Sequence, residues 1–281
     1  MTLPLAVYLS FKELWRNRAR FFLVSLVIAL ITILVLFIAG LGEGLGTANR
    51  EYLENLDAQL LVFRDKSDFV VPASRLDQSA VEQIRSLAGV ESAGGIATSN
   101  VAILLPGDEV LKVSLLGVDP GYPGSPEAQQ GESLQTDSAY QVVIDQNVID
   151  RTDIEVGDTI AVRTTQGTED VLYDLEVIGI TSGQSYTFQP SIFVTYATWD
   201  ELRTKSDAEL RRPSSTVNVI AVTLDDPEQL DAVSQRIQAE ISNSAVADIQ
   251  TAIENVPGYS AQQGTIQTQG IFTLLIGILV I

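Results

Sequence analysis

An unbroken apolar segment, FFLVSLVIALITILVLFIAGL, covers residues 21–41 and holds no charged side chain. A helix of these 21 residues rises about 31 Å, close to the roughly 30 Å hydrocarbon core of a bilayer. Buried helices of soluble proteins are usually shorter and carry a polar stripe. The apolar part of a cleaved signal peptide runs only roughly 7–15 residues. The pattern therefore predicts an uncleaved transmembrane helix over 21–41.

A second apolar segment, GIFTLLIGILVI, occupies residues 270–281. Its 12 residues are too few to cross a bilayer as a helix, which needs about 20. We expect it to be the first part of a second transmembrane helix that is cut in mid-span, with the polar residues 246–269 as a return stalk. A packed C-terminal helix is the alternative.

Between these segments, shorter apolar runs alternate with turn residues. Apolar side chains at helical spacing over 42–57 predict an amphipathic stalk that continues the first helix. A strand is expected over 58–64 and a helix within 76–90, followed by strands over 100–106 and 110–119. This strand–helix–strand–strand order is typical of a helix packed on one face of a mixed sheet.

The pattern then changes twice. Residues 119–138 contain three prolines and three glycines without apolar periodicity, which predicts a loop. Alternating apolar positions over 130–212 predict a β-rich lobe. The first architecture resumes with a strand over 215–224 and a helix over 225–242, which Asp226 is placed to cap with proline at the first helical position.

The predicted fold class is therefore α+β, with a transmembrane helix, a two-lobed extracytoplasmic domain and the start of a second transmembrane helix. The mixed β-α lobe comprises 58–129 and 213–245, and the β-rich lobe of 130–212 is inserted into it. Within the inserted lobe, strands are expected over 141–145, 154–164, 171–181 and 191–196, with a short helical turn over 197–203.

Charge orients this arrangement in a membrane. The whole chain carries a formal net charge of −19, yet four bases oppose one acid within the first twenty residues. The remainder holds 13 basic and 35 acidic residues, a net charge of −22. Positive flanks stay on the cytoplasmic side, so we expect the N-terminus inside and the acidic bulk outside. A region with so negative a net charge has no electrostatic reason to bind nucleic acid.

Residues 1–20 also predict an amphipathic elbow helix at the cytoplasmic membrane interface. Its bases are placed to contact lipid phosphates or acidic groups of a partner, and simple topogenic charge is the alternative. Our hypothesis is that Trp15 and Arg16 hold the elbow against the bilayer. The candidate elbow and coupling residues are Phe11, Lys12, Leu14, Trp15, Arg16, Arg18 and Arg20.

The sequence contains no catalytic constellation. It has no His and no Cys, which excludes imidazole and thiolate catalysis and zinc sites built on these ligands. It also lacks the G-x-x-x-x-G-K-[ST] pattern of a P-loop and the G-x-S-x-G pattern of a hydrolase elbow. Carboxylate pairs are too numerous in so acidic a chain to indicate a site. We expect no cofactor and no metal.

Several phrases follow one another along most of the chain. After the basic, aromatic SFKELWRNRARFF come LAGVESAGG, LLGVDP, VVIDQNVI, VGDTI, LEVIGI and VIAVTLDDPEQLDAVSQRI. In this order they resemble the ABC-transporter permeases of the macrolide-exporter, lipoprotein-release and FtsX-like group, and the region between the apolar segments resembles their MacB-like periplasmic core domain. Within the group, the DevC-like glycolipid-exporter branch is the most similar.

The resemblance implies a permease subunit in a bacterial inner membrane, working as a homodimer or paired permease with a separate cytoplasmic ATPase. ATP-driven movement would pass through the membrane helices to the extracytoplasmic domain, for export or extraction of a lipid-like, lipoprotein or drug cargo. Membrane lipid and a periplasmic adaptor are the other implied partners. The third and fourth spans of the family pattern are missing from this sequence.

A membrane-anchored binding or sensory domain without transport activity is a different interpretation of residues 1–269. The natural reading frame beyond Ile281 distinguishes the two, because a permease requires two more apolar spans and a neighbouring ATPase gene. A soluble enzyme is a third class, and it would require hydrolase or transferase activity from the purified domain.

Overall fold

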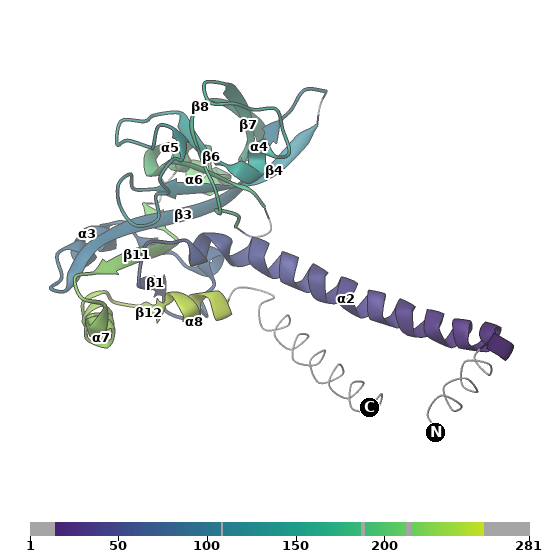
Figure 1. Ribbon diagram of the computed structural model, residues 1–281. Helices are drawn as coiled ribbons and strands as arrows, with labels where there is room; N and C mark the ends of the chain where they lie inside the picture. The colour runs from purple at the N-terminus through teal and green to yellow at the C-terminus, as the bar shows by residue number, and fades with distance from the viewer. Residues whose placement is uncertain (1–14, 108, 187–188, 212–214, 256–281) are drawn as a thin grey trace. The chain divides into compact units, whose positions relative to one another are not determined.

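The computed structural model describes residues 15–107, 109–186, 189–211 and 215–255 (Figure 1). Of these, the residues up to Leu45 form one compact unit and those from Gly46 onward form another. Helix α2 (Arg18–Glu54) contains 37 residues and contributes to both units.

Helix α2 includes the apolar segment and the first part of the stretch predicted to continue it. Within this helix, Thr32 Oγ1 donates a hydrogen bond to the carbonyl oxygen of Ile28 at 2.9 Å. Phe22, Leu36 and Phe37 are each at least 66% exposed. In the part of the chain that the structure describes, no helix has the combined length and hydropathy needed to cross a bilayer. A membrane crossing by residues 21–41 stays a prediction.

In the second unit, ten strands of the described residues form one sheet in the order β12-β1-β11-β3-β4-β9-β6-β8-β5, with β7 paired to β3 and β8. Neighbouring strands are antiparallel except for the parallel pairs β4–β9 and β6–β8. Strands β2 (Leu76–Asp77) and β10 (Thr216–Val217) form a separate pair. The strands of the large sheet are β1 (Leu60–Arg64), β3 (Val90–Leu104), β4 (Val110–Val118), β5 (Gln130–Gly131), β6 (Gln141–Asp145), β7 (Thr159–Gln166), β8 (Glu169–Thr181), β9 (Ser191–Thr195), β11 (Val219–Leu224) and β12 (Ser244–Asp248).

Short helices cover the sheet. Helices α3 (Ser79–Arg85) and α7 (Leu230–Glu240) bury apolar side chains such as Ile84 and Val233 in a cluster with β1 and β11. As predicted, Asp226 caps the turn that leads into α7, accepting a hydrogen bond from the Glu228 amide at 3.0 Å. The other helices in the described ranges are α4 (Gln146–Ile149), α5 (Tyr196–Leu202), α6 (Asp207–Arg211) and α8 (Ile249–Glu254), with 3-10 turns at Val71–Ala73 and Pro227–Gln229.

Strand β3 is longer than predicted, because it begins at Val90 rather than at residue 100. Its first ten residues, VESAGGIATS, contain two adjacent glycines and few large apolar side chains, so they carry a weak strand pattern. Its first part pairs with β11 and its second part with β4 and β7. The strands of the expected β-rich lobe therefore share one sheet with those of the β-α lobe.

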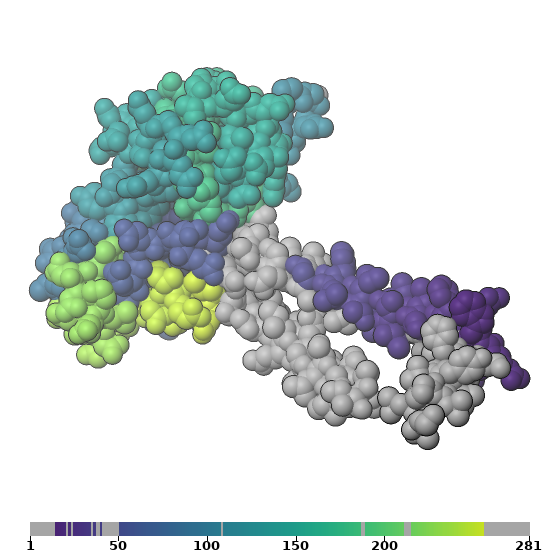
Figure 2. Space-filling model, viewed as in Figure 1, coloured from purple at the N-terminus to yellow at the C-terminus, as the bar shows by residue number. Residues whose placement is uncertain are grey.

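The prediction of a stalk over 246–269 is wrong for its first residues. Residues 246–248 end strand β12, which pairs with β1 along its whole length, and α8 follows directly. The small side chains of SAVAD hide this strand from a hydrophobicity pattern. Both α7 and α8 contact β12, and they lie beside each other on the face shown in Figure 2. The remaining stalk residues and the segment 270–281 lie outside the described residues.

Helices α4 and α6 interrupt the lobe that was predicted to be β-rich. They contain four and five residues, which is too short for a helical period to show in the sequence. The helical turn predicted over 197–203 is present as α5.

Gly94 of β3 should not tolerate a side chain. A Cβ atom there would lie 2.2 Å from the carbonyl oxygen of Pro123, so the backbone would have to move. We expect Gly94→Ala to lower the free energy of unfolding by about 2–3 kcal/mol, measured by urea unfolding. Gly107→Ala is the control, because its Cβ meets no atom within 4 Å and only its φ of +83° opposes the change, at about 1 kcal/mol. Equal losses in the two variants would contradict the expectation.

Candidate functional site

The elbow candidates are only partly described. Those in the described residues are exposed: Trp15, Arg16, Arg18 and Arg20. Outside the described residues lie Phe11, Lys12 and Leu14. Arg18 and Arg20 belong to the first turn of α2, and the role of all seven at a membrane stays a prediction.

The last turns of α2 enter the core of the second unit through Tyr52. This side chain is 3% exposed, and its ring lies against Tyr186 and Phe193 with centroid distances of 6.0 and 5.7 Å. Its hydroxyl donates to the carbonyl oxygen of Gly124 at 2.9 Å. Because burial raises the pKa of Tyr52 well above its usual range, the hydroxyl keeps this proton across the physiological pH range.

A second set of contacts ties α2 to residues 183–185, which follow β8. The side-chain amide of Asn55, just beyond α2, donates to the carbonyl oxygen of Gly183 at 2.6 Å. The backbone amide of Tyr52 donates to the Ser185 carbonyl at 3.1 Å, and the Ser185 amide donates to Glu51 Oε2 at 3.2 Å. The end of α2 is thus held by two separate segments of the domain.

Behind these contacts lies a fully buried carboxylate, Asp145, at the end of β6. Its Oδ2 accepts hydrogen bonds from Asn147 Nδ2 at 3.0 Å and from Ser185 Oγ at 3.4 Å. Its Oδ1 makes no hydrogen bond within the described residues. Burial raises the pKa of Asp145, the Asn147 hydrogen bond opposes the rise, and the charge of Glu51 on α2 adds to it.

Asp145→Asn should therefore stabilise the domain at neutral pH. The unfolded carboxyl titrates near pH 3.9 and the folded one at higher pH, so the folded state binds the extra proton between these values. Wild-type stability then falls as the pH rises through that window. We expect the free energy of unfolding of Asp145→Asn to exceed the wild-type value at pH 7, with a smaller difference at pH 4. A difference that grows on acidification would contradict the assignment.

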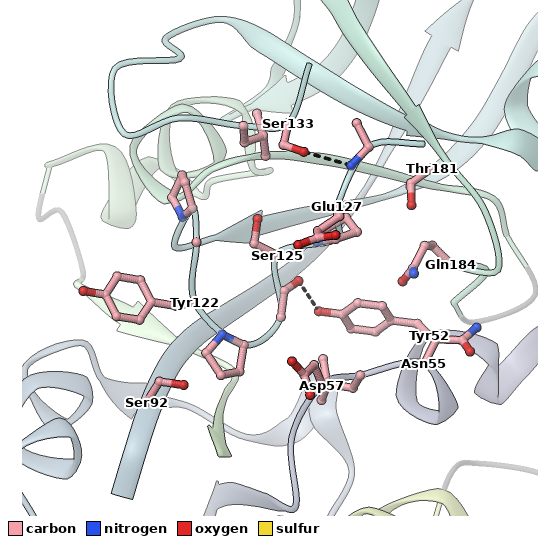
Figure 3. A pocket seen from close by; sticks show the side chains of 18 of the residues that line it. Tyr52, Asn55, Asp57, Ser92, Tyr122, Ser125, Glu127, Ser133, Thr181 and Gln184 are labelled. Carbon is pink, nitrogen blue, oxygen red and sulfur yellow. Dashed lines mark hydrogen bonds between the residues drawn. The ribbon is translucent and has the colours of Figure 1, made fainter. Parts of the chain in front are cut away.

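A cavity of about 960 Å³ lies beside the end of α2 (Figure 3). Its walls come from the end of α2 and the residues up to Asp57, the loop that follows β4, the start of β3, and the residues after β8. Tyr52, Asn55 and Gln184 line the cavity (Figure 3). Tyr52 and Asn55 also make the hydrogen bonds that attach the end of α2 to the domain. The helix attachment and the cavity therefore share side chains.

The loop wall of this cavity is fixed at its start. Arg85 of α3 forms an ion pair with Asp119 at 3.0 Å, and its guanidinium lies 3.6 Å from the ring centroid of Tyr122. Asp119 also accepts a hydrogen bond from the amide of Gly95 on β3 at 3.1 Å. Stacking and ion pairing of one arginine thus hold the loop against both α3 and β3.

The arrangement can attach α2 to the domain and can offer hydrogen-bonding groups to a molecule in the cavity. In the described residues, no group of three or more acidic side chains is arranged to hold a metal ion. Three carboxylates, of Asp57, Glu91 and Glu127, line the cavity, together with many hydroxyl and amide side chains.

A family model identifies the domain that carries this site. The model of the MacB-like periplasmic core domain matches residues 21–240, which is most of the chain. The chain belongs to this family. This match confirms the resemblance to the MacB-like periplasmic core domain that the sequence phrases indicated. The matched region begins at residue 21, the first residue of the apolar segment.

One protein similar in sequence to this chain comes from Staphylococcus haemolyticus and is described as a hemin transport system permease, HrtB. It is 23% identical over 255 residues, which are 91% of this chain and 64% of that protein. The chain thus spans less than two thirds of the length of this relative.

Two solved structures are similar at low identity. The periplasmic region of MacB from Actinobacillus actinomycetemcomitans is 15% identical, with a TM-score of 0.49 over 71% of this chain and 92% of that one. The extracellular domain of the ABC-type transporter YknZ from Gram-positive bacteria is 12% identical, with a TM-score of 0.47 over 67% and 99%.

The sequence did not reveal the α2 attachment or the cavity. Their hydrogen bonds join residues as far apart as Tyr52 and Gly124, or Asn55 and Gly183. The one local signal was the loop predicted over 119–138, whose prolines and glycines indicated an irregular segment.

Proposed function

We propose that this chain is part of a permease subunit of an ABC transporter, in which α2 carries movement from a cytoplasmic ATPase to the extracytoplasmic MacB-like domain. Residues 21–41 would cross a bacterial inner membrane with the N-terminus in the cytoplasm. Residues 270–281 would begin the return span. ATP would be hydrolysed by the separate subunit, and the chain itself would act without a cofactor.

The observation that carries this proposal is the attachment of the end of α2. One helix runs from the basic flank through the apolar segment to Glu54, and its last turns are hydrogen bonded to two segments of the domain. A continuous helix transmits displacement along its axis because each of its turns is hydrogen bonded to the next. Tyr52, Glu51 and Asn55 are then the points at which movement enters the domain.

The other partners follow from the same proposal. The permease would act as a homodimer or a pair, with membrane lipid around α2 and a periplasmic adaptor as a further partner. The elbow residues Trp15 and Arg16 would hold residues 1–20 against the bilayer. The cargo would be lipid-like, a lipoprotein or a drug, moved by export or extraction.

The test separates attachment from folding. The full-length permease with its ATPase is reconstituted in liposomes, any cysteine outside residues 1–281 is replaced with serine, and a single cysteine is introduced at the exposed Leu172. Spin labels on it report the distance between the two copies. We expect ATP to change this distance, and we expect Tyr52→Phe combined with Asn55→Ala to abolish the change while ATP hydrolysis persists.

A matched control removes a surface hydrogen bond of the same kind elsewhere. Gln250 Nε2 donates to Glu254 on α8 at 2.8 Å, and Gln250→Ala should leave the ATP-dependent distance change intact. An unaltered distance change in the Tyr52 and Asn55 double variant would defeat the proposal.

The cavity favours a second candidate function, a membrane-anchored binding domain without transport activity. It would retain ligand binding but show no ATP-dependent movement in the same assay. A reading frame that ends without two further apolar spans would also favour it.

A further inference from the structure

Two buried polar side chains face the cavity beside α2. Thr181 is 2% exposed and Gln184 is 8% exposed, and both line the cavity. Neither side chain makes a hydrogen bond with any described residue, although the surrounding loops are densely hydrogen bonded. Figure 3 shows the two side chains on the same side of the cavity. Both side chains are therefore available to hydrogen bond with a molecule inside the cavity.

The size and lining of the cavity define that molecule. Its volume of about 960 Å³ is at the upper end of the roughly 300–1,000 Å³ of ligand sites. Small-molecule sites are usually lined mainly by hydrophobic and aromatic side chains, with only a few polar groups. This one is lined mainly by hydroxyl, amide and carboxylate groups, which suits a ligand that presents many hydrogen-bonding groups.

Charge narrows the choice further. Asp57, Glu91 and Glu127 are exposed residues of the lining, and no lysine or arginine lines the cavity in the described residues. Their field disfavours an anion. The most buried polar side chains of the lining, those of Thr181, Tyr52 and Gln184, are neutral, so no lining group at depth would compensate a desolvated cation. The exposed ring of Tyr122 adds one flat apolar surface that Arg85 supports from one face.

We propose that this cavity binds a neutral, polyhydroxylated ligand with the chemistry of sugar rings. Ring hydroxyls would donate to the carboxylates and to Gln184 Oε1, and would accept from Gln184 Nε2 and the Thr181 hydroxyl. The apolar face of a ring would lie on Tyr122. This inference concerns only what the cavity binds, and it stands or falls independently of the coupling through α2.

The experiment uses the full chain in phosphatidylcholine nanodiscs, prepared without sugar-based detergent. Maltotriose, cellotriose and chitotriose are titrated by calorimetry, with spermidine and citrate as a cationic and an anionic probe. A second arm places galactosyl diacylglycerol in the nanodisc, which distinguishes a free saccharide from a lipid headgroup. We expect at least one neutral saccharide, free or lipid-linked, to bind more tightly than spermidine and citrate.

Variants locate the binding. Gln184→Ala and the isosteric Thr181→Val should each weaken saccharide binding at least tenfold, while Gln83→Ala, on the exposed face of α3, should not. Unchanged melting temperatures show that the variants remain folded. The proposal is overturned if no saccharide binds at millimolar concentration, if spermidine or citrate binds preferentially, or if both cavity variants bind the saccharide as tightly as the wild type does.

Discussion

Replacing Phe193 with alanine is expected to lower the free energy of unfolding by about 3–5 kcal/mol. Phe193 is fully buried on β9, and its ring lies 5.7 Å from that of Tyr52 on α2. The cluster around it also contains Phe63 of β1 and Val143 of β6. Truncation would therefore leave a hole where strands from both predicted lobes meet the end of α2, a site with little freedom to collapse.

Urea unfolding of the full chain in detergent, followed by circular dichroism, measures this loss. Leu172→Ala on β8 provides the comparison, because that side chain is 55% exposed and its removal should cost less than about 0.5 kcal/mol. A loss below about 1 kcal/mol for Phe193→Ala would mean that the cluster is not a single cooperative core.

Tyr52→Ala should have an effect of similar size, about 3–5 kcal/mol. The substitution removes a ring that is 3% exposed and also leaves the carbonyl of Gly124 without its partner. Tyr52→Phe separates the two terms, because it keeps the ring and loses only the hydroxyl. We expect Tyr52→Phe to cost about 1–2 kcal/mol.

The pH dependence of these variants provides a further check. Burial raises the pKa of Tyr52 well above its usual range, so the hydroxyl donates to Gly124 throughout the range from about pH 5 to 9. The stability difference between wild type and Tyr52→Phe should therefore be constant over that range. A difference that disappears near pH 9 would show that the hydroxyl ionises and is not enclosed as described.

Much of the secondary structure was predictable because its signals are local. The cap at Asp226, the apolar face of α7 and the dense apolar run LLVFR of β1 each lie within one short stretch. What escaped prediction was decided by partners distant in the sequence. The small side chains of β12 make a strand because β1 pairs with them. Gly94 and Gly95 belong to β3 because β11 pairs with them, and they are glycines because Pro123 and Val217 approach too closely for a side chain.

The candidate site was even harder to predict from the sequence. Basic and aromatic residues near the N-terminus attract attention in an acidic chain, whereas Tyr52, Asn55 and Ser185 are ordinary residue types in unremarked positions. Their significance comes from hydrogen bonds to Gly124, Gly183 and Glu51, respectively, none of which has a sequence signature. The family match covers residues 21–240 and identifies the domain without singling out these residues.

Strand β3 connects the two parts of the large sheet. Its 15 residues extend about 50 Å, and they are paired with β11 at one end and with β4 and β7 at the other. Bending it would break several ladder hydrogen bonds at once, so the halves on either side cannot pivot like a hinge. If α2 moves as proposed above, a displacement near Tyr52 would therefore reach the far hairpin, where β3 turns into β4.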